Sequence, residues 1–474
     1  MHSLYKQIFA SLGPIAVSFS NGFVIGLQSV IIPNIRESSI KLTLQQESWL
    51  PAIMILMLFP SQFISGLLTS KFGRKYVILA SQIPSVFAFV LLYLSQEFWH
   101  FFIAFLLSGL VGGGLGIGPM FLAEICSPKY RGVFMNLKIG FFAIGIALVH
   151  ILSNFFHWRS LIMYGLISSL LGIISTAYCP DSPSWFASKG RFDECKKTFH
   201  WFRGDSENKE LKQLIECQSK DLKRKQLISM ENKLTVCKHL RERSFLLAVS
   251  LNLSCVLIVE ACGKQQFMMY VFDIFSSIFS DKNNFYYYAF GLDLCDIIGG
   301  FTSCFVIHKF NRRSMLLGSG IPANILLYFI CALSFCFSQD FISDKYSWVM
   351  ICLFAVYFFI LSCGALPTCF IIMGEVYPLE YRGVGVSISS IIFVGTMFIV
   401  TKISPFMLKY CGVSGTFLIN AVISSLVLIH IYYYLPETNR KTLQDIENEL
   451  KNNNNEINED VEENIMLGNT FVSS

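Results

Sequence analysis

The sequence predicts an all-α membrane protein whose twelve transmembrane helices form two six-helix bundles. The first observation is composition: 53% of the 474 residues are hydrophobic and only 15% are charged, whereas soluble domains carry about 25% charged residues. The second is that long uncharged stretches alternate with short loops that hold nearly all the Lys and Arg. The third is that three short motifs occur twice, in the same order, once in each half of the chain.

Twelve apolar runs are long enough to cross a bilayer, since about 20 residues of helix span roughly 30 Å of hydrocarbon. They lie at residues 8–32, 48–70, 76–96, 100–124, 133–156, 159–179, 244–276, 285–308, 314–337, 347–374, 384–408 and 414–435. The runs predict an N-terminal bundle at 1–180 and a C-terminal bundle at 244–436. Residues 181–243 are expected to form a partly helical cytoplasmic linker, and 437–474 a mostly disordered cytoplasmic tail.

Basic residues are concentrated on one side of the membrane. They lie in the loops after the second, fourth, eighth and tenth runs and in the segment 181–243, while the other loops contain few of them. Loops rich in Lys and Arg stay in the cytoplasm. We therefore expect a multi-pass protein of the cell membrane with both termini cytoplasmic. The first run, from about residue 8 to 32, is too long for the apolar core of a signal peptide.

The remaining composition argues against other classes of protein. The net charge of +5 follows from the same orientation rule, so no nucleic-acid partner is expected. Acids interspersed in 181–243 favour a solvated linker over a surface for nucleic acid or anionic lipid. The fifteen cysteines include no CxxC pair, which indicates packing residues and not a metal site. No nucleophile–base pair or phosphate loop is apparent, so we expect no enzyme, no catalytic residue and no cofactor.

Three motif pairs carry the internal repeat. Residues 70–75 (SKFGRK) correspond to 308–313 (HKFNRR), 123–132 (AEICSPKYRG) to 374–383 (GEVYPLEYRG), and 180–183 (PDSP) to 436–439 (PETN). The members of each pair are separated by roughly 240 to 255 residues. This pattern predicts two bundles related by an axis along the membrane normal, with a solute site at their interface near the midplane.

Two acids in the second motif pair suggest a gate. Glu124 and Glu375 stand just inside a span end, each seven residues before an Arg, and carboxylates at that depth need partners. We expect them to pair with Arg residues of neighbouring loops when the cytoplasmic side is closed, so that breaking the pairs opens it. The predicted gating residues are Lys71, Arg74, Glu124, Arg131, Lys309, Arg312, Glu375 and Arg382.

The motifs resemble those of the sugar porter family of the major facilitator superfamily, most of all its insect facilitated trehalose transporter-like members. The resemblance runs from about Gly22 to Glu449 and includes residues 180–186 (PDSPSWF) and 201–204 (WFRG). It implies the major facilitator fold, alternating access and a sugar as solute. Most of these motifs lie at cytoplasmic span ends, so they bear on fold and gating more than on the solute.

The chain departs from the family where sugar is bound. The candidate solute-binding residues, placed by this resemblance, are His150, Glu260, Lys264, Gln265, Gln266, Asp296 and Thr368. Glu260 and Asp296 stand where the family has neutral amides, and Thr368 where it has Trp. Gly364 and Pro367 keep the break that the family has in its tenth span. The resemblance thus implies a cavity that is more charged and less aromatic than usual.

Charges inside the predicted spans allow two interpretations. Glu260 and Lys264 are four residues apart in one predicted helix, so they share a face and can pair. The pair either stabilises the helix without meeting solute, or lines the cavity and binds a polar or zwitterionic solute. Asp296 has no partner in its own helix, and Asp293 is a like charge one turn away, which leaves room for proton coupling.

We predict a monomeric facilitative carrier of a hexose or trehalose, with the solute and the lipid bilayer as its partners. Proton-coupled sugar porters usually carry an acid in the first span, and the stretch from Ser11 to Ile35 contains none. One alternative is a proton-coupled carrier, or a carrier of a charged or polyol-like solute, that uses Asp296 and Glu260. The other is a sugar sensor without net transport, against which the short tail argues.

Overall fold

The computed structural model describes residues 2–37, 40–204, 207–227, 243–279, 284–307, 309–339, 341–342, 346–377 and 382–437. Every regular element in these ranges is a helix. Twelve helical segments are long and apolar enough to cross a membrane. The predicted all-α class and number of spans are therefore confirmed.

The first six spans form one bundle. Its helices are α1 (His2–Glu37), α2 (Leu44–Phe72), α3 (Arg74–Tyr93), α4 (Phe98–Gly109), α5 (Gly112–Ile125), α6 (Pro128–Leu152) and α7 (Trp158–Tyr178), with α4 and α5 forming a single span. Helix α1 packs against both α6 and α7. Its Phe23 and Leu27 are fully buried, and neighbouring helices enclose most of its span.

Three shorter helices follow the sixth span: α8 (Pro183–Ser188), α9 (Phe192–Arg203) and α10 (Asn208–Leu227). They lie within the segment expected to be a partly helical linker. The rest of that segment, 228–242, and the expected disordered tail beyond 437 lie outside the described residues.

The last six spans form the second bundle. Its elements are α12 (Arg243–Ala261), α13 (Lys264–Ile278), α14 (Phe285–Val306), α15 (Arg312–Ser338), α16 (Ser347–Ile360), the π-helix Leu361–Ala365, α17 (Leu366–Glu375), α18 (Arg382–Tyr410) and α19 (Gly412–Tyr434). The seventh span is made of α12 and α13, and the tenth of α16, the π-helix and α17. The expected break in the tenth span is thus present, and it takes the form of a π-helix.

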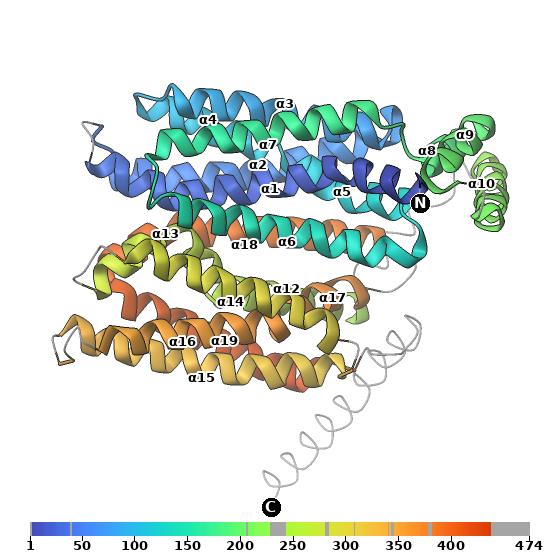
Figure 1. Ribbon diagram of the computed structural model, residues 1–474. Helices are drawn as coiled ribbons and strands as arrows, with labels where there is room; N and C mark the ends of the chain where they lie inside the picture. The colour runs from blue at the N-terminus through green and yellow to red at the C-terminus, as the bar shows by residue number, and fades with distance from the viewer. Residues whose placement is uncertain are drawn as a thin grey trace, which may run out of the picture.

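Figure 1 shows the two bundles side by side with their helices running in one general direction, and α8, α9 and α10 gathered at one end near the N-terminus. We call this the basic end, because Lys71, Arg74, Lys129, Arg131 and Lys309 lie in its helix ends and loops, and we call the other the opposite end. The bundles meet where α2 packs on α18, α6 on α14, and α1 on α13.

Polar contacts between the bundles are confined to the half of the spans nearer the opposite end, as far as the described residues show. The contacting pairs are Arg36 with Asp273, Lys402 with Ser48 and with the Gln45 carbonyl, His150 with Asp293, and Asn154 with Tyr287. The bundles are therefore fastened together at the opposite end.

Large apolar side chains cover the outer faces of the spans. Phe63, Leu67, Leu171 and Phe305 are among those that are exposed. Apolar surface on this scale marks a region that is not in contact with water, as expected for helices that face lipid.

Candidate functional site

The seventh span is interrupted at its middle. Gly263 adopts the left-handed conformation, with φ of 70°, between the end of α12 and the start of α13, and glycine enters this region without steric cost. The interruption frees the Cys262 carbonyl, which accepts a hydrogen bond of 2.6 Å from the Tyr357 hydroxyl. A broken helix in a membrane needs such a replacement donor.

This break corrects one expectation. Glu260 and Lys264 do not share a continuous helix, because Glu260 belongs to α12 and Lys264 is the first residue of α13. The rule that pairs side chains four residues apart applies only within one helix. The structure instead pairs Lys264 with Asp296 of α14.

Lys264, Asp296 and Ser362 form a central cluster, and we keep this name for the three residues. The Lys264 ammonium forms an ion pair with Asp296 and donates to the Ser362 hydroxyl at 2.9 Å, and that hydroxyl donates in turn to Asp296. Ser362 lies in the π-helix of the tenth span, and π-helical turns occur often at functional sites. The Lys264 and Asp296 side chains remain 18% and 11% exposed. The cluster is therefore charge-balanced yet still accessible.

Two of the predicted solute-binding residues are held inside the C-terminal bundle. The Gln266 side chain is buried, and its carbonyl oxygen accepts from the Asn420 amide at 2.7 Å. Thr368 is fully buried, and its hydroxyl donates to the Gly364 carbonyl of its own span at 2.8 Å. Both side chains therefore bind protein partners in this structure.

Glu260 and Gln265 carry buried polar atoms without a hydrogen-bond partner among the described residues. These atoms are Glu260 Oε2 and Gln265 Nε2. The Glu260 side chain is almost fully buried, whereas Gln265 is partly exposed beside Lys264. A buried polar atom without a partner costs about 1–3 kcal/mol, so these two atoms are polar groups that the described protein partners leave unsatisfied.

His150 joins the two bundles. Its Nδ1 lies 2.6 Å from Asp293 Oδ2 on α14, and its Nε2 lies 3.0 Å from the Ser29 hydroxyl on α1. His150 is 1% exposed, and the Phe272 ring packs edge-on against the imidazole. Asp293, which the sequence showed only as a like charge near Asp296, thus has a partner of its own.

At the basic end of the N-terminal bundle, Arg74 and Glu124 form a bidentate ion pair. The two Arg74–Glu124 nitrogen–oxygen distances are 3.0 and 3.1 Å, and Glu124 also accepts from Ser182. Both residues belong to the same bundle. Among the described residues, no polar contact joins the two bundles at this end.

Asp181 caps the start of α3. Its carboxylate accepts from the backbone N–H groups of Arg74 and Lys75 at 3.0 and 3.2 Å. Burial raises the pKa of the Asp181 carboxyl above its ordinary value, and the backbone hydrogen bonds act in the other direction. Gly73, with φ of 102°, is required here because a Cβ would lie 1.9 Å from Asp181 Oδ2.

The C-terminal bundle repeats this cap. Glu437 accepts from the backbone N–H groups of Arg312 and Arg313 at 2.8 and 3.1 Å. Asp181 and Glu437 are the acids of the repeated PDSP and PETN motifs. The repeat was visible in the sequence, but the capping role of these two acids was not inferred from it. The second residue of both motifs is an acid, and this shared feature could have predicted an equivalent role for Asp181 and Glu437.

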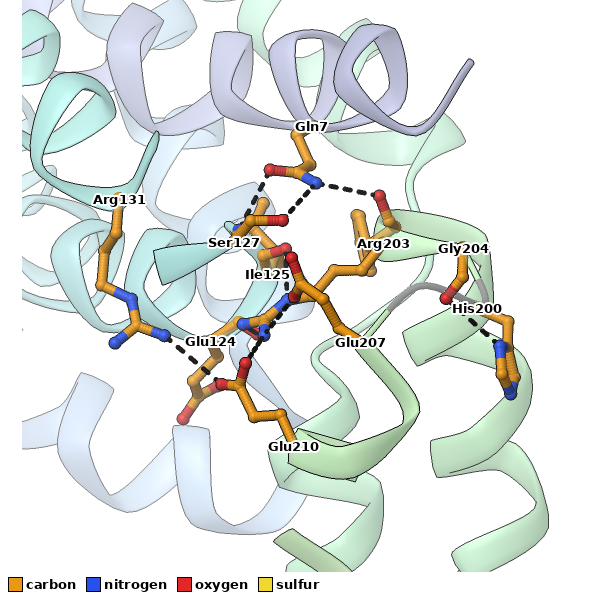
Figure 2. A network of polar contacts seen from close by, with 11 residues as sticks. Gln7, Glu124, Ile125, Ser127, Arg131, His200, Arg203, Gly204, Glu207 and Glu210 are labelled. Atoms are coloured by element: carbon orange, nitrogen blue, oxygen red, sulfur yellow. Dashed lines mark hydrogen bonds and ion pairs between the residues drawn. The ribbon is translucent and has the colours of Figure 1, made fainter. Parts of the chain in front are cut away.

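Figure 2 shows a second network at the basic end, centred on Arg203 of α9. The Arg203 guanidinium donates to the backbone carbonyls of Glu124 and Ile125 at 3.0 and 3.3 Å, and to Glu207 and Glu210 at 3.2 and 2.7 Å. Cations are favoured at a helix C-terminus such as that of α5. The network therefore fastens α9 and α10 to α5.

The same network holds two further elements. Glu210 lies 3.7 Å from Arg131 of α6. Gln7 of α1 donates to the Ser127 hydroxyl at 3.1 Å and to the Phe202 carbonyl at 3.2 Å, as Figure 2 shows for the Ser127 bond. Arg131, one of the predicted gating residues, is thus tied to α10.

The other predicted gating residues are less constrained. The Lys71 ammonium lies 5.1 Å from the Phe72 ring centre, and Lys309 lies in the loop before α15. The Arg312 side chain donates to the Ile307 carbonyl at 2.5 Å. The side chains of Glu375 and Arg382 lie outside what the structure describes.

Comparisons with known proteins agree with this architecture. The model of the family described as "Sugar (and other) transporter" matches residues 6–450. The facilitated trehalose transporter Tret1 of Drosophila pseudoobscura pseudoobscura is 27% identical, over 94% of this chain and 51% of the relative. Tret1 of Polypedilum vanderplanki is 26% identical, over 94% and 88%. The chain spans about half the length of the Drosophila relatives that it matches.

A solved structure shows the same fold. The inward-open conformation of the xylose transporter XylE from E. coli superimposes with a TM-score of 0.74 at 14% identity, over 94% of this chain and 99% of XylE. The likeness at this identity concerns the fold, which is that of the major facilitator superfamily. Together with the family match over nearly the whole chain, it leads to one conclusion. The chain belongs to the sugar (and other) transporter family.

Proposed function

We propose that this protein is a facilitative carrier of a neutral sugar, a hexose or a disaccharide such as trehalose, and that it works by alternating access. One observation carries the mechanism: among the described residues, polar contacts join the two bundles only in the half nearer the opposite end. A carrier of two such bundles exposes its midplane site to one side at a time by rocking them. Family membership and the relatives named as trehalose transporters support the solute class.

We place the basic end in the cytoplasm, because its loops are rich in Lys and Arg. We further propose that the protein lies in the cell membrane and works as a monomer. On this placement the structure is closed toward the outside. The solute meets the central cluster and Gln265, whose charged and amide groups offer strong hydrogen bonds to sugar hydroxyls. His150, Glu260, Gln266 and Thr368 shape and support the site.

The gating role of the basic-end residues follows from the same mechanism. Lys71, Arg74, Glu124 and Arg131, with Lys309, Arg312, Glu375 and Arg382 in the second bundle, stand at the loops that must approach each other when that end closes. The Arg74–Glu124 pair is present although described residues form no polar contact between the bundles there. We therefore infer that this pair shapes its own bundle for closure.

One set of observations favours a second candidate, a proton-coupled carrier or a carrier of a charged solute. Lys264 and Asp296 are accessible, and Glu260 has a buried oxygen with no partner among the described residues. Carboxyl groups inside membrane spans are typical of proton and ion pathways.

Uptake of labelled glucose and trehalose into proteoliposomes, at acidic and neutral pH and with or without a protonophore, tests the proposal. Saturable uptake of either sugar that the protonophore does not change supports the facilitative carrier. Uptake that collapses with the protonophore supports the proton-coupled candidate. If protein shown to be folded moves neither sugar, the sugar assignment is wrong, and charged solutes are the next class to test.

A further inference from the structure

The opposite end is held by contacts that meet at the first turn of α2. Arg36, in the last turn of α1, forms a bidentate ion pair with Glu47 at 3.0 and 2.8 Å. Its remaining Nη1 lies 2.6 Å from Asp273 Oδ1 of α13, in the other bundle. One guanidinium thus has one carboxylate partner in each bundle.

Lys402 of α18 makes a second contact at the same turn. Its ammonium donates to the Ser48 hydroxyl at 2.7 Å and lies 4.0 Å from the centre of the Trp49 ring. The Trp49 ring also packs against Phe398 of α18. Ammonium groups are attracted to the face of an aromatic ring. Two cations, one from each bundle, therefore cross the interface on either side of the start of α2.

The Arg36–Asp273 contact is built so that it can open. The Arg36 and Asp273 side chains are 40% and 20% exposed, and both line a cleft of about 240 Å³ that also includes Asn34 and Tyr286. When the pair separates, water in the cleft can solvate Asp273. Arg36 meanwhile keeps its bidentate bond to Glu47, which is only 7% exposed. Neither charge is left in hydrocarbon, where an unpaired charge is costly.

His150–Asp293 differs in this respect. Both side chains are buried, and His150 is 2% and Asp293 10% exposed. Water reaches that pair less easily than it reaches Arg36 and Asp273. Among the described residues, Arg36–Asp273 is therefore the charge pair between the bundles that water reaches most easily, which allows it to break and form repeatedly.

We propose that Arg36, Asp273 and Lys402 form a clamp that holds the solute path shut at the opposite end and breaks when that end opens. Arg36 and Asp273 are its gating pair, Glu47 positions Arg36, and Lys402 is the second fastening. The clamp lies at the other end of the molecule from every gating residue expected from the sequence. It rests on the proposed carrier function, since only an alternating carrier needs a seal that opens.

Loss of the clamp should change which end is open. Asp273→Asn removes the charge from the one carboxylate that crosses the interface to Arg36. A charge-assisted hydrogen bond is about twice as strong as a neutral one, so we expect the closed-to-open ratio at the opposite end to fall by roughly tenfold. A larger open fraction lowers the apparent KM for solute offered at that end and raises it for solute offered at the basic end.

The test is hydrogen exchange followed by mass spectrometry on the full chain in lipid nanodiscs, which requires no solute. Asp273→Asn and Lys402→Met should raise exchange in the opposite-end segments of α1, α13 and α18 and lower it at the basic ends of α5 and α14. Glu47→Gln, which weakens the positioning of Arg36, should act in the same direction but less. Glu37→Gln is the matched control, because Glu37 neighbours Arg36 but forms no ion pair among the described residues.

Two results would overturn the clamp: exchange in Asp273→Asn and Lys402→Met equal to that of the wild type, or exchange raised equally at both ends, as in general destabilisation. A shift with opposite signs at the two ends supports it. This measurement involves no transport, so its result does not depend on the identity of the solute. If the exchange shift occurs in a protein that transports neither sugar, the clamp is supported and the proposed sugar substrate is wrong.

Discussion

At the scale of single residues, two pairs of ionisable side chains inside the spans join different elements. Lys264 meets Asp296, and His150 meets Asp293. The sequence indicates that these charges need partners, because an isolated charge inside a span is costly. It does not indicate which residue pairs with Lys264, because that pairing depends on the left-handed break at Gly263. That break separates Lys264 from the helix of Glu260 and directs it toward α14.

Lys264→Gln should destabilise the protein by about 2 kcal/mol, because it leaves Asp296 with Ser362 as its remaining partner in the central cluster. The double variant Lys264→Gln/Asp296→Asn replaces the ion pair by two neutral groups and should recover most of that loss. Thermal unfolding of purified protein in detergent measures both. If the double variant were as unstable as the single one, the pair would not be the reason for the loss.

Gly73→Ala should destabilise the start of α3 by about 2 kcal/mol, since a positive φ is unfavourable for alanine and its Cβ would overlap the Asp181 carboxylate. Gly66→Ala within α2 is the matched control, because a Cβ added at Gly66 would meet no atom within 4 Å. We expect no loss of stability there. Equal unfolding midpoints for the two variants would contradict this account of Gly73.

At the scale of elements, the broken spans were the hardest feature to predict. The apolar run at 244–276 reads as one helix, because composition is the same on both sides of Gly263. A glycine in an apolar run is as compatible with a continuous transmembrane helix as with a break. The tenth-span break was expected only through the family resemblance at Gly364 and Pro367. The structure adds that Ser362 within this break contacts Lys264 beside the other one.

Tyr357→Phe tests the seventh-span break directly. The variant removes the hydroxyl that satisfies the Cys262 carbonyl, and an unpaired buried carbonyl costs about 1–3 kcal/mol. A fall of several degrees in the unfolding midpoint is expected. Tyr328→Phe serves as control, because the Tyr328 hydroxyl bonds Ser425 at an exposed site where Asn324 also bonds that serine. A similar fall in both variants would count against a special role for Tyr357.

At the scale of the whole molecule, the sequence was most informative. Twelve apolar runs correspond to twelve spans, and the repeated motifs place Asp181 and Glu437 at equivalent caps in the two bundles. The thickness of the bilayer sets the length of the spans, and the internal repeat sets the order of the motifs. Both can therefore be predicted from the sequence without knowledge of tertiary contacts. The long-range pairs, such as Arg36 with Asp273, depend on how the bundles meet. No local sequence pattern predicts which residues of the two bundles come into contact.

The linker helices provide a further prediction at this scale. Arg203→Met should loosen α9 and α10 from α5, because Arg203 is 3% exposed and joins two backbone carbonyls to two acids. We expect a loss of about 2 kcal/mol and faster proteolysis within α10. Arg191→Met removes an exposed ion pair with Glu194 and a cation–π contact with the Phe186 ring, each worth about 0–1 kcal/mol at an exposed site. Proteolysis at equal rates in the two variants would contradict the role given to Arg203.

The most direct test of alternating access by this protein is counterflow. Proteoliposomes are loaded with unlabelled trehalose or glucose and diluted into a trace of the labelled sugar. A facilitative carrier that returns with solute bound will accumulate label transiently above its equilibrium level, and the excess will persist with a protonophore present. We predict this overshoot for at least one of the two sugars. A monotonic approach to equilibrium with both sugars, from folded and reconstituted protein, would contradict the account.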